Sequence, residues 1–267
     1  MPNQPWSTPL DRTRWRNGEL SSGSREIAEE TPVALVYDAS TYAVMMASPA
    51  DLEDFAIGFS LTEGVIDAPS QVRGLEIVSA PLGIEARLWL APERGARLAE
   101  RRRFIAGPTG CGLCGIDSLE QAVRRWPPVD GREVRITPDE VRAAGAAVAA
   151  AQPLGQATRA AHAAGYWRRG EGLVAAREDV GRHNALDKLI GALARAGESG
   201  VDGAVLLTSR VSIEMVQKTA RLGASILIAV SAPTALAVRT ADEAGITLIA
   251  VAREDGFEVF THPQRVA

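Results

Sequence analysis

The sequence contains little cysteine and no long apolar run. Only two of its 267 residues are cysteine, Cys111 and Cys114. No apolar stretch reaches the roughly 18 residues that a membrane-spanning helix requires. The opening residues, MPNQPWSTPLDRTRW, lack the apolar segment of a secretory signal. We therefore expect a cytoplasmic protein with no membrane partner, a setting in which a structural disulfide would be unusual.

An excess of positive charge is also lacking. The chain has 33 acidic and 29 basic residues, a net charge of -4, which argues against a nucleic-acid partner. Neither a G-x-G-x-x-G nor a Walker sequence occurs, which excludes the standard nucleotide-binding folds.

Changes in composition divide the chain into three parts. Residues 1–28 are polar and rich in Pro, Ser and Arg, which predicts a loosely ordered arm. Residues 29–116 predict a small α+β domain of four strands and one helix, with Ser48 as the helix N-cap. This domain ends in an arginine-rich connector and the loop that carries both cysteines.

Residues 117–267 predict an α/β domain. GAVLLTS, ASILIAVSA and ITLIAVAR are apolar runs typical of strands buried on both faces, and helical segments ending at Gly223 and Gly245 separate them. This alternation predicts a mostly parallel sheet with right-handed crossovers. A capping box, Thr137 to Glu140, predicts the start of a further helix.

The loop TGCGLCG allows four interpretations. Structural zinc needs four ligands, and no histidine is spaced to complete a finger. A thioredoxin-like dithiol needs a rigid helix start, whereas this pair lies in a glycine-rich run. A sulfur carrier needs an exposed thiol that can visit two partners, which the glycines favour. The pair can also be incidental.

Polar residues at two predicted strand ends predict an anion site. TSRVS (208–212) and SAPT (231–234) each lead into a helix N-terminus, where backbone N–H groups are available to phosphate. The candidate anion-binding residues are Arg210, Ser212, Ser231 and Thr234. The two serines can equally be simple helix caps. In VGRHNALDKL, His183 either points into this cleft or belongs to a solvated polar face. The C-terminal FEVFTHP reads as an edge strand.

In combination these motifs resemble the formate dehydrogenase accessory sulfurtransferases, the FdhD/NarQ family. The resemblance rests on TGCGLCG, REDVGRHNALDKLIG, TSRVSIEMVQK, SAPTALAV and FEVFTHP, in this order, from about residue 30 onward. It implies a cytidine-deaminase-like C-terminal domain with a smaller domain in front, and a homodimer. A true deaminase is disfavoured because Ala185 stands where its catalytic glutamate would be.

The resemblance also implies an activity. A cysteine desulfurase would supply sulfur, and the acceptor would be the molybdenum of a bis(molybdopterin guanine dinucleotide) cofactor that formate dehydrogenase needs. By position, Cys111 would hold the persulfide and Cys114 would be a second, less defined cysteine. The stretch that would contact the cofactor consists of Phe257, Glu258, Val259, Phe260, Thr261 and His262. No permanently bound metal is implied.

Two other classes of function remain open from the sequence. A C-x-x-C oxidoreductase would need both thiols equally, and a non-catalytic cofactor chaperone would need neither. The sequence does not distinguish molybdenum from tungsten or assign a role to His162.

Overall fold

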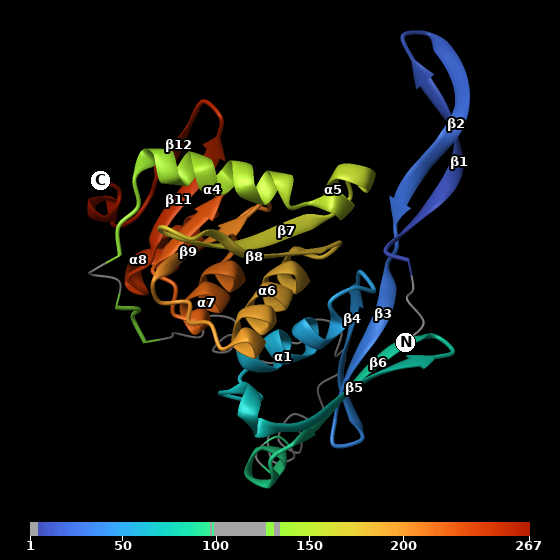
Figure 1. The fold of residues 1–267 in the computed structure, drawn as a ribbon, viewed down its shortest axis with the longest axis horizontal. Coiled ribbons are helices and arrows are strands. Elements are labelled where there is room, and N and C mark those ends of the chain that lie inside the picture. Colours follow the sequence, from blue (N-terminus) through green and yellow to red (C-terminus); the bar gives the residue numbers. More distant parts are fainter. Residues whose placement is uncertain (1–4, 97, 99–126, 131–133) are drawn as a thin grey trace.

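The computed structural model describes residues 5–96, 98, 127–130 and 134–267. The predicted cysteine loop, with Cys111 and Cys114, lies outside the described residues. Two sheets, a set of helices and a projecting N-terminal ribbon make up the described structure (Figure 1). None of its described helices is long and apolar enough to cross a membrane.

The larger sheet has six strands in the order β12-β11-β10-β9-β7-β8. The three central strands pair in parallel, as predicted, and confirm an α/β fold; they are β9 (Gly203–Leu207), β10 (Ile226–Ala229) and β11 (Thr247–Arg253). The flanking strands pair antiparallel, so the sheet is mixed; they are β7 (His162–Arg168), β8 (Gly172–Asp179) and β12 (Gly256–Val259).

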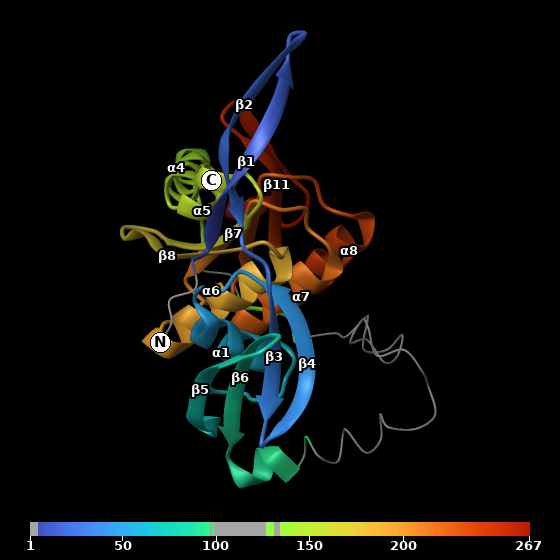
Figure 2. The ribbon, with the colours of Figure 1, turned by 90° about the vertical axis from the view of Figure 1, so that its right-hand side faces the viewer.

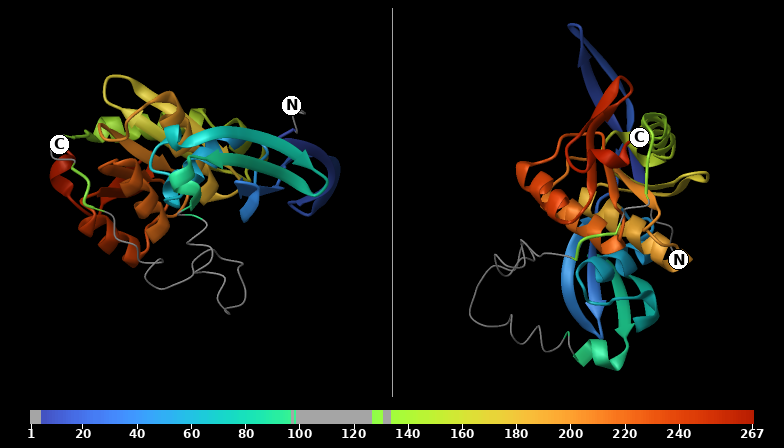
Figure 3. Two further views of the ribbon diagram at one scale, coloured as in Figure 1. Left: turned by 90° about the horizontal axis from the view of Figure 1, so that it is seen from below. Right: turned by 90° about the vertical axis from the view of Figure 1, so that its left-hand side faces the viewer.

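Helices cover both faces of this sheet (Figures 1 and 3). One face carries α4 (Pro138–Ala150), which begins at the predicted capping box, and the short α5 (Pro153–Thr158) lies beside it. The other face carries α6 (Arg182–Ala196), α7 (Ile213–Leu222) and α8 (Ala235–Glu243). Each face therefore has its own apolar cluster, as strands buried on both sides require.

The smaller domain is a four-stranded sheet in the order β4-β3-β6-β5, with one helix against it. Its elements are β3 (Thr31–Tyr37), β4 (Ser40–Ala47), α1 (Leu52–Thr62), the 3-10 turn η1 (Pro69–Gln71), β5 (Val72–Ala80) and β6 (Gly83–Leu90). Ten of the eleven residues of α1 are buried. The helix is buried all round because it lies between two layers.

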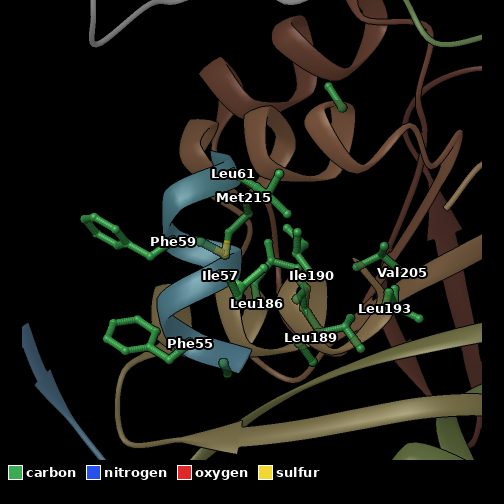
Figure 4. Packing of buried hydrophobic residues seen from close by; sticks show 14 of the residues in the cluster. Phe55, Ile57, Phe59, Leu61, Leu186, Leu189, Ile190, Leu193, Val205 and Met215 are labelled. Carbon is green, nitrogen blue, oxygen red and sulfur yellow. The ribbon is translucent and has the colours of Figure 1, made fainter. Parts of the chain in front are cut away.

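The helix α1 joins the two domains into one core. Its Phe55 and Phe59 point away from α6, and Phe59 meets the Tyr42 ring of β4 edge-on (Figure 4). Ile57 and Leu61 point toward α6 and α7. A single buried cluster consequently runs from β3 to β11 through both helices.

Two glycines permit the close approach of α1 and α6. A Cβ added at Gly58 would lie 1.7 Å from the carbonyl oxygen of Asp187, and one added at Gly191 would lie 1.8 Å from that of Asp54. Both obstacles are backbone atoms, which cannot rotate aside. Only glycine at both positions allows this contact.

Residues 7–28 are more ordered than the composition of the N-terminal segment predicts. β1 (Ser7–Arg16) and β2 (Glu19–Ala28) pair over their full length as an antiparallel ribbon that projects from the body (Figure 2). Asn17 and Gly18 form its tip with positive φ angles of 53° and 87°. Asn-Gly is the usual two-residue hairpin turn, so the expected loose arm is a β-hairpin.

The predicted role of Ser48 as a helix cap is wrong. The helix begins at Leu52, four residues after Ser48, with Asp51 at the N-cap in the left-handed region. The Ser48 hydroxyl instead accepts a hydrogen bond from the backbone of Val180, in the other domain. Serine is a common N-cap residue, but here a tertiary hydrogen bond to Val180 occupies the Ser48 hydroxyl.

Candidate functional site

Polar groups gather at the carboxyl edge of the central parallel strands. Strand β9 leads into Thr208 to Ser212, and β10 leads into Ser231 to Thr234. Because β7 runs opposite to β9, its first residue, His162, lies at this same edge. The Thr208 hydroxyl accepts a hydrogen bond of 2.8 Å from the Ala163 backbone there.

The two strand-end loops are joined to each other. Val211 and Pro233 form a parallel bridge, and the Thr234 amide donates 2.9 Å to the Val211 carbonyl. Thr234 caps α8 through a bond from the Ala237 amide, whereas Ser212 occupies the N-cap of α7 with no capping bond from its side chain. Arg210 is exposed at this edge. The two joined loops therefore place the four candidates at one edge of the sheet, namely Arg210, Ser212, Ser231 and Thr234.

His183 reaches the same edge from α6. Its Nε2 lies 4.0 Å from Oε2 of Glu214, in the first turn of α7. The His183 side chain, with a smaller contribution from Ser212, lowers the pKa of Glu214 to about 2. The Glu214 carboxylate therefore stays charged beside the imidazole at this edge of the sheet.

Two more basic groups stand beside His183. The pKa of His162 is lowered, first because the ring is half-buried and then because the Arg182 cation lies near it. The Nε atom of Arg182 is shielded from solvent and has no hydrogen-bond partner among the described residues. Arg182 and Arg210 thus supply positive charge at an edge where helix N-termini also offer N–H groups.

A buried ion pair fixes the turn that carries Arg182 and His183. Asp179 and Lys188 are both fully buried, 2.7 Å apart. The Asp179 carboxylate also accepts from the backbone of Gly181 at 2.7 Å and from that of Ser48 at 3.0 Å. This many donors satisfy a carboxylate that could not otherwise be buried.

The smaller domain takes part in the same network. Lys188 donates to the Ser48 carbonyl at 3.0 Å, and Asn184 donates to the Met46 carbonyl at 2.8 Å and to Asp179 at 3.0 Å. The Asn184 and Lys188 side of α6 is therefore not a solvated face, which was one interpretation of the sequence. These residues connect the domains and hold the start of α6 in place.

Asp187 of α6 is also buried. Asp187 receives Lys218 of α7 at 2.6 and 2.8 Å and the Thr62 hydroxyl of α1 at 2.7 Å. This triad holds three helices together rather than facing a ligand. Of the polar residues in VGRHNALDKL, His183 and Arg182 reach the candidate site and the others are structural.

The C-terminal stretch runs away from this edge within one chain. Because β12 is antiparallel to β11, only its first residues, with Phe257 and Glu258, lie toward the carboxyl edge. Val259 pairs with Ile249, and Phe260 donates to the Leu248 carbonyl. The predicted cofactor residues 257–262 are thus spread along the strand and not gathered in one cleft.

The last two predicted cofactor residues lie at the opposite edge of the sheet. The Thr261 hydroxyl is buried, accepts from the Leu248 amide at 2.8 Å and donates to the Ile246 carbonyl at 2.6 Å. His262 Nε2 lies 3.1 Å from the Asp242 carbonyl, at the C-terminal end of α8. One chain therefore does not bring Thr261 and His262 to Arg210 and Ser231.

Sequence reasoning missed Glu214 and left His162 unassigned. The signal for Glu214 was its place two residues after the predicted cap Ser212, in the first turn of α7. His162 needed the antiparallel pairing of β7 with β9, which no local pattern reveals. No group of three His, Cys, Asp or Glu side chains suited to a metal occurs among the described residues.

The sequence matches known proteins over nearly its whole length. The family model described as the FdhD/NarQ family matches residues 28–267. The chain belongs to this family. It is 53% identical over 255 residues to the sulfur carrier protein FdhD of Agrobacterium fabrum, covering 96% of this chain and 94% of that protein.

Other FdhD/NarQ relatives agree with this assignment. The sulfur carrier protein FdhD of Brucella abortus is 50% identical over 266 residues, covering 100% of this chain and 99% of the relative. A crystal structure of a putative formate dehydrogenase accessory protein from Desulfotalea psychrophila aligns with a TM-score of 0.76 at 27% identity. It covers 98% of this chain and 100% of that one.

Proposed function

We propose that this FdhD/NarQ protein is a sulfurtransferase that carries persulfide sulfur on Cys111. The donor is a cysteine desulfurase. The acceptor is the molybdenum of a bis(molybdopterin guanine dinucleotide) cofactor, bound as a client before it reaches the formate dehydrogenase catalytic subunit. The observation that carries the proposal is the C-G-L-C-G motif in a chain about half identical to proteins named sulfur carriers.

The chemistry is one thiol–persulfide exchange followed by transfer of the outer sulfur to the acceptor metal. The Cys111 thiolate attacks the outer sulfur of the desulfurase persulfide, an S–S bond forms, and the desulfurase thiolate leaves. In the second step the outer sulfur passes to the metal as sulfide, with two electrons from the metal, and Cys111 returns as thiolate. The first step needs a reduced Cys111 thiolate and the second step restores it, which is consistent with a cytoplasmic location.

The carboxyl edge is the proposed binding site for the anionic cofactor. Arg182 and Arg210 supply charge, the α7 and α8 N-termini supply N–H groups, and Glu214 holds His183 at their side. The shielded Nε of Arg182 is a donor for which a phosphate oxygen is the fitting acceptor. Phe257 and Glu258 extend the site along β12.

The carrier step is tested by intact-protein mass after incubation with a cysteine desulfurase and L-cysteine. We expect a reducible adduct of one sulfur on the wild type and on Cys114→Ser, and none on Cys111→Ser. If no variant gains sulfur, the chaperone alternative replaces the carrier. If Cys111→Ser and Cys114→Ser abolish formate dehydrogenase activation equally, the result supports the oxidoreductase alternative instead.

The cofactor site is tested separately by calorimetry with guanosine diphosphate as the probe. We expect Arg210→Ala to weaken binding about tenfold, as the loss of a charged phosphate contact would. Arg239→Ala, an exposed arginine in the middle of α8, is the matched control and should bind like the wild type. Equal binding by all three proteins would show that the phosphate-binding site does not include Arg210 at this edge of the sheet.

A further inference from the structure

Val251 has a backbone conformation that β-branched residues avoid. Its φ angle is 52°, in the left-handed region, where a valine is an outlier. The other non-glycine residues with positive φ in the described ranges lie in turns or at the ends of helices, whereas Val251 lies inside strand β11. Strain of this kind persists only where the surrounding structure imposes it, and it clusters at ligand sites.

A β-bulge imposes this conformation. The register of β11 against its neighbour β12 shifts between Ala250 and Arg253 (Figure 1). Val251 and Ala252 therefore stand together opposite the single residue Phe257. In one common type of bulge the first of the two residues is left-handed and is a glycine. Valine occupies that position here, although glycine would adopt the same φ without strain.

The bulge also removes the Val251 side chain from the apolar core. Ile249 belongs to the cluster on the α4 face and Ala250 to the cluster on the other face, as alternation along a strand requires. The next residue that packs on the α4 face is Ala252, so the alternation skips Val251. Val251 is half-buried but belongs to neither cluster of the described residues. Core packing therefore does not account for a strained valine here.

A second valine lies beside the first at the carboxyl edge of the sheet. The Val251 amide donates 3.3 Å to the carbonyl of Ser231, where β10 leads into the loop before α8. Val230, the residue before Ser231, is 43% exposed although it directly follows a fully buried strand. The parallel register of Ile228 with Ile249, continued by two residues, places Val230 next to Val251.

The groups suited to phosphate belong to the loops that adjoin this pair. The loop from Ser231 runs to the N-terminus of α8, where Thr234 is the cap. The bridge between Val211 and Pro233 joins that loop to the one that carries Arg210. Inorganic phosphate would need only these polar groups. An aliphatic surface next to them fits a ligand that carries a flat ring on its phosphates, because such sites combine apolar walls with a few polar contacts.

We propose that Val230 and Val251 form an apolar platform for the purine ring of the nucleotide part of the cofactor. The proposal deepens the cofactor site proposed above and rests on it. The bulge frees the Val251 side chain from both core faces, and the amide bond to Ser231 fixes the adjacent Val230. A branched side chain offers a ring face more apolar contact than glycine does, which accounts for valine at a position whose backbone suits glycine.

Calorimetry with two probes tests the platform. Guanosine diphosphate carries a purine ring, and inorganic pyrophosphate is a diphosphate without one. We expect Val251→Gly and Val230→Ser each to weaken binding of guanosine diphosphate about fivefold through lost apolar contact, and to leave pyrophosphate binding unchanged. Val201→Ser is the matched control, because this valine is 48% exposed at the opposite edge, just before β9. It should bind both probes like the wild type.

Thermal unfolding separates a ligand contact from a structural role. Val251→Gly relieves the left-handed strain and removes no side chain of the two apolar clusters. We therefore expect this variant to melt at or above the wild-type temperature while it binds guanosine diphosphate more weakly. Val251→Ile keeps the branched side chain and should restore wild-type binding.

Two results would overturn the proposal. One is a Val251→Gly protein that melts lower and binds guanosine diphosphate normally, which would show a structural role. The other is an equal loss of affinity for both probes, which would place the valines at the phosphates instead of the ring. Failure of the whole cofactor site is recognisable separately, because Arg210→Ala would then also bind guanosine diphosphate like the wild type.

Discussion

Replacing Gly191 by alanine should destabilise the protein severely. The new Cβ would lie 1.8 Å from the Asp54 carbonyl oxygen and 2.7 Å from its carbon. An ordinary contact needs more than 3.4 Å, so α1 and α6 must move apart by about 1.5 Å along a tightly packed crossing. Overpacking against movable side chains costs about 1–3 kcal/mol. Because backbone atoms cannot rotate away, we expect at least about 3 kcal/mol here.

The assay is thermal unfolding followed by circular dichroism. A loss of about 3 kcal/mol corresponds to a fall in Tm of about 6–12 °C for a chain of this size. Gly145→Ala in α4 is the matched control, because nothing lies within 4 Å of its added Cβ. That change should stabilise the helix by up to about 1 kcal/mol. If Gly191→Ala and Gly145→Ala melt alike, the close helix crossing is not as described.

Three further outcomes follow from single contacts. Lys188→Met should cost about 3–5 kcal/mol, because it leaves a fully buried carboxylate without its cation; a wild-type urea midpoint would contradict this. Arg169 lowers the pKa of Glu140 to about 2, so this pair's stabilisation is complete above about pH 4.5 and disappears as pH falls toward 2. The urea midpoints of wild type and Glu140→Gln should therefore converge over that range, and a constant gap would refute it. Thr234→Ala should cost about 1 kcal/mol in the same assay, and Ser212→Ala less, because only Thr234 makes a capping bond.

Local chemistry made much of the larger domain predictable. The box from Thr137 to Glu140 forms both of its reciprocal bonds, and α7 ends at Gly223 with φ of 85°. Continuous apolar runs identified the parallel strands because both faces of each strand are covered. Such features depend on residues a few positions apart, which a sequence displays directly.

Structural features that depend on residues far apart in the sequence could not be predicted from local patterns. Ser48 has the composition of a helix cap, yet its hydroxyl serves a backbone amide 132 residues away. Asn184 and Lys188 have the spacing of a solvated face, but carbonyls of the other domain cover them. Polar side chains at helical spacing do not say whether water or a second domain receives their hydrogen bonds.

The ribbon shows a different kind of failure. The N-terminal segment that contains it is polar and has several prolines, which favoured a loose arm, although Asn17-Gly18 is a strong hairpin signal. Alternating Arg12, Arg14 and Arg16 is a period-two pattern of a strand with one charged face. Average composition concealed both signals, which are visible only in the order of the residues.

The joint between α1 and α6 also constrains how the chain can be made. Lys188 bonds to Ser48 across 140 residues, and the apolar core beneath α1 is shared with the second half of the chain. During synthesis the first sheet would emerge with one side of its helix exposed. It would stay incomplete until α6 left the ribosome. Contacts of such long range slow folding, so the early intermediate is the stage at which this protein would most need a chaperone.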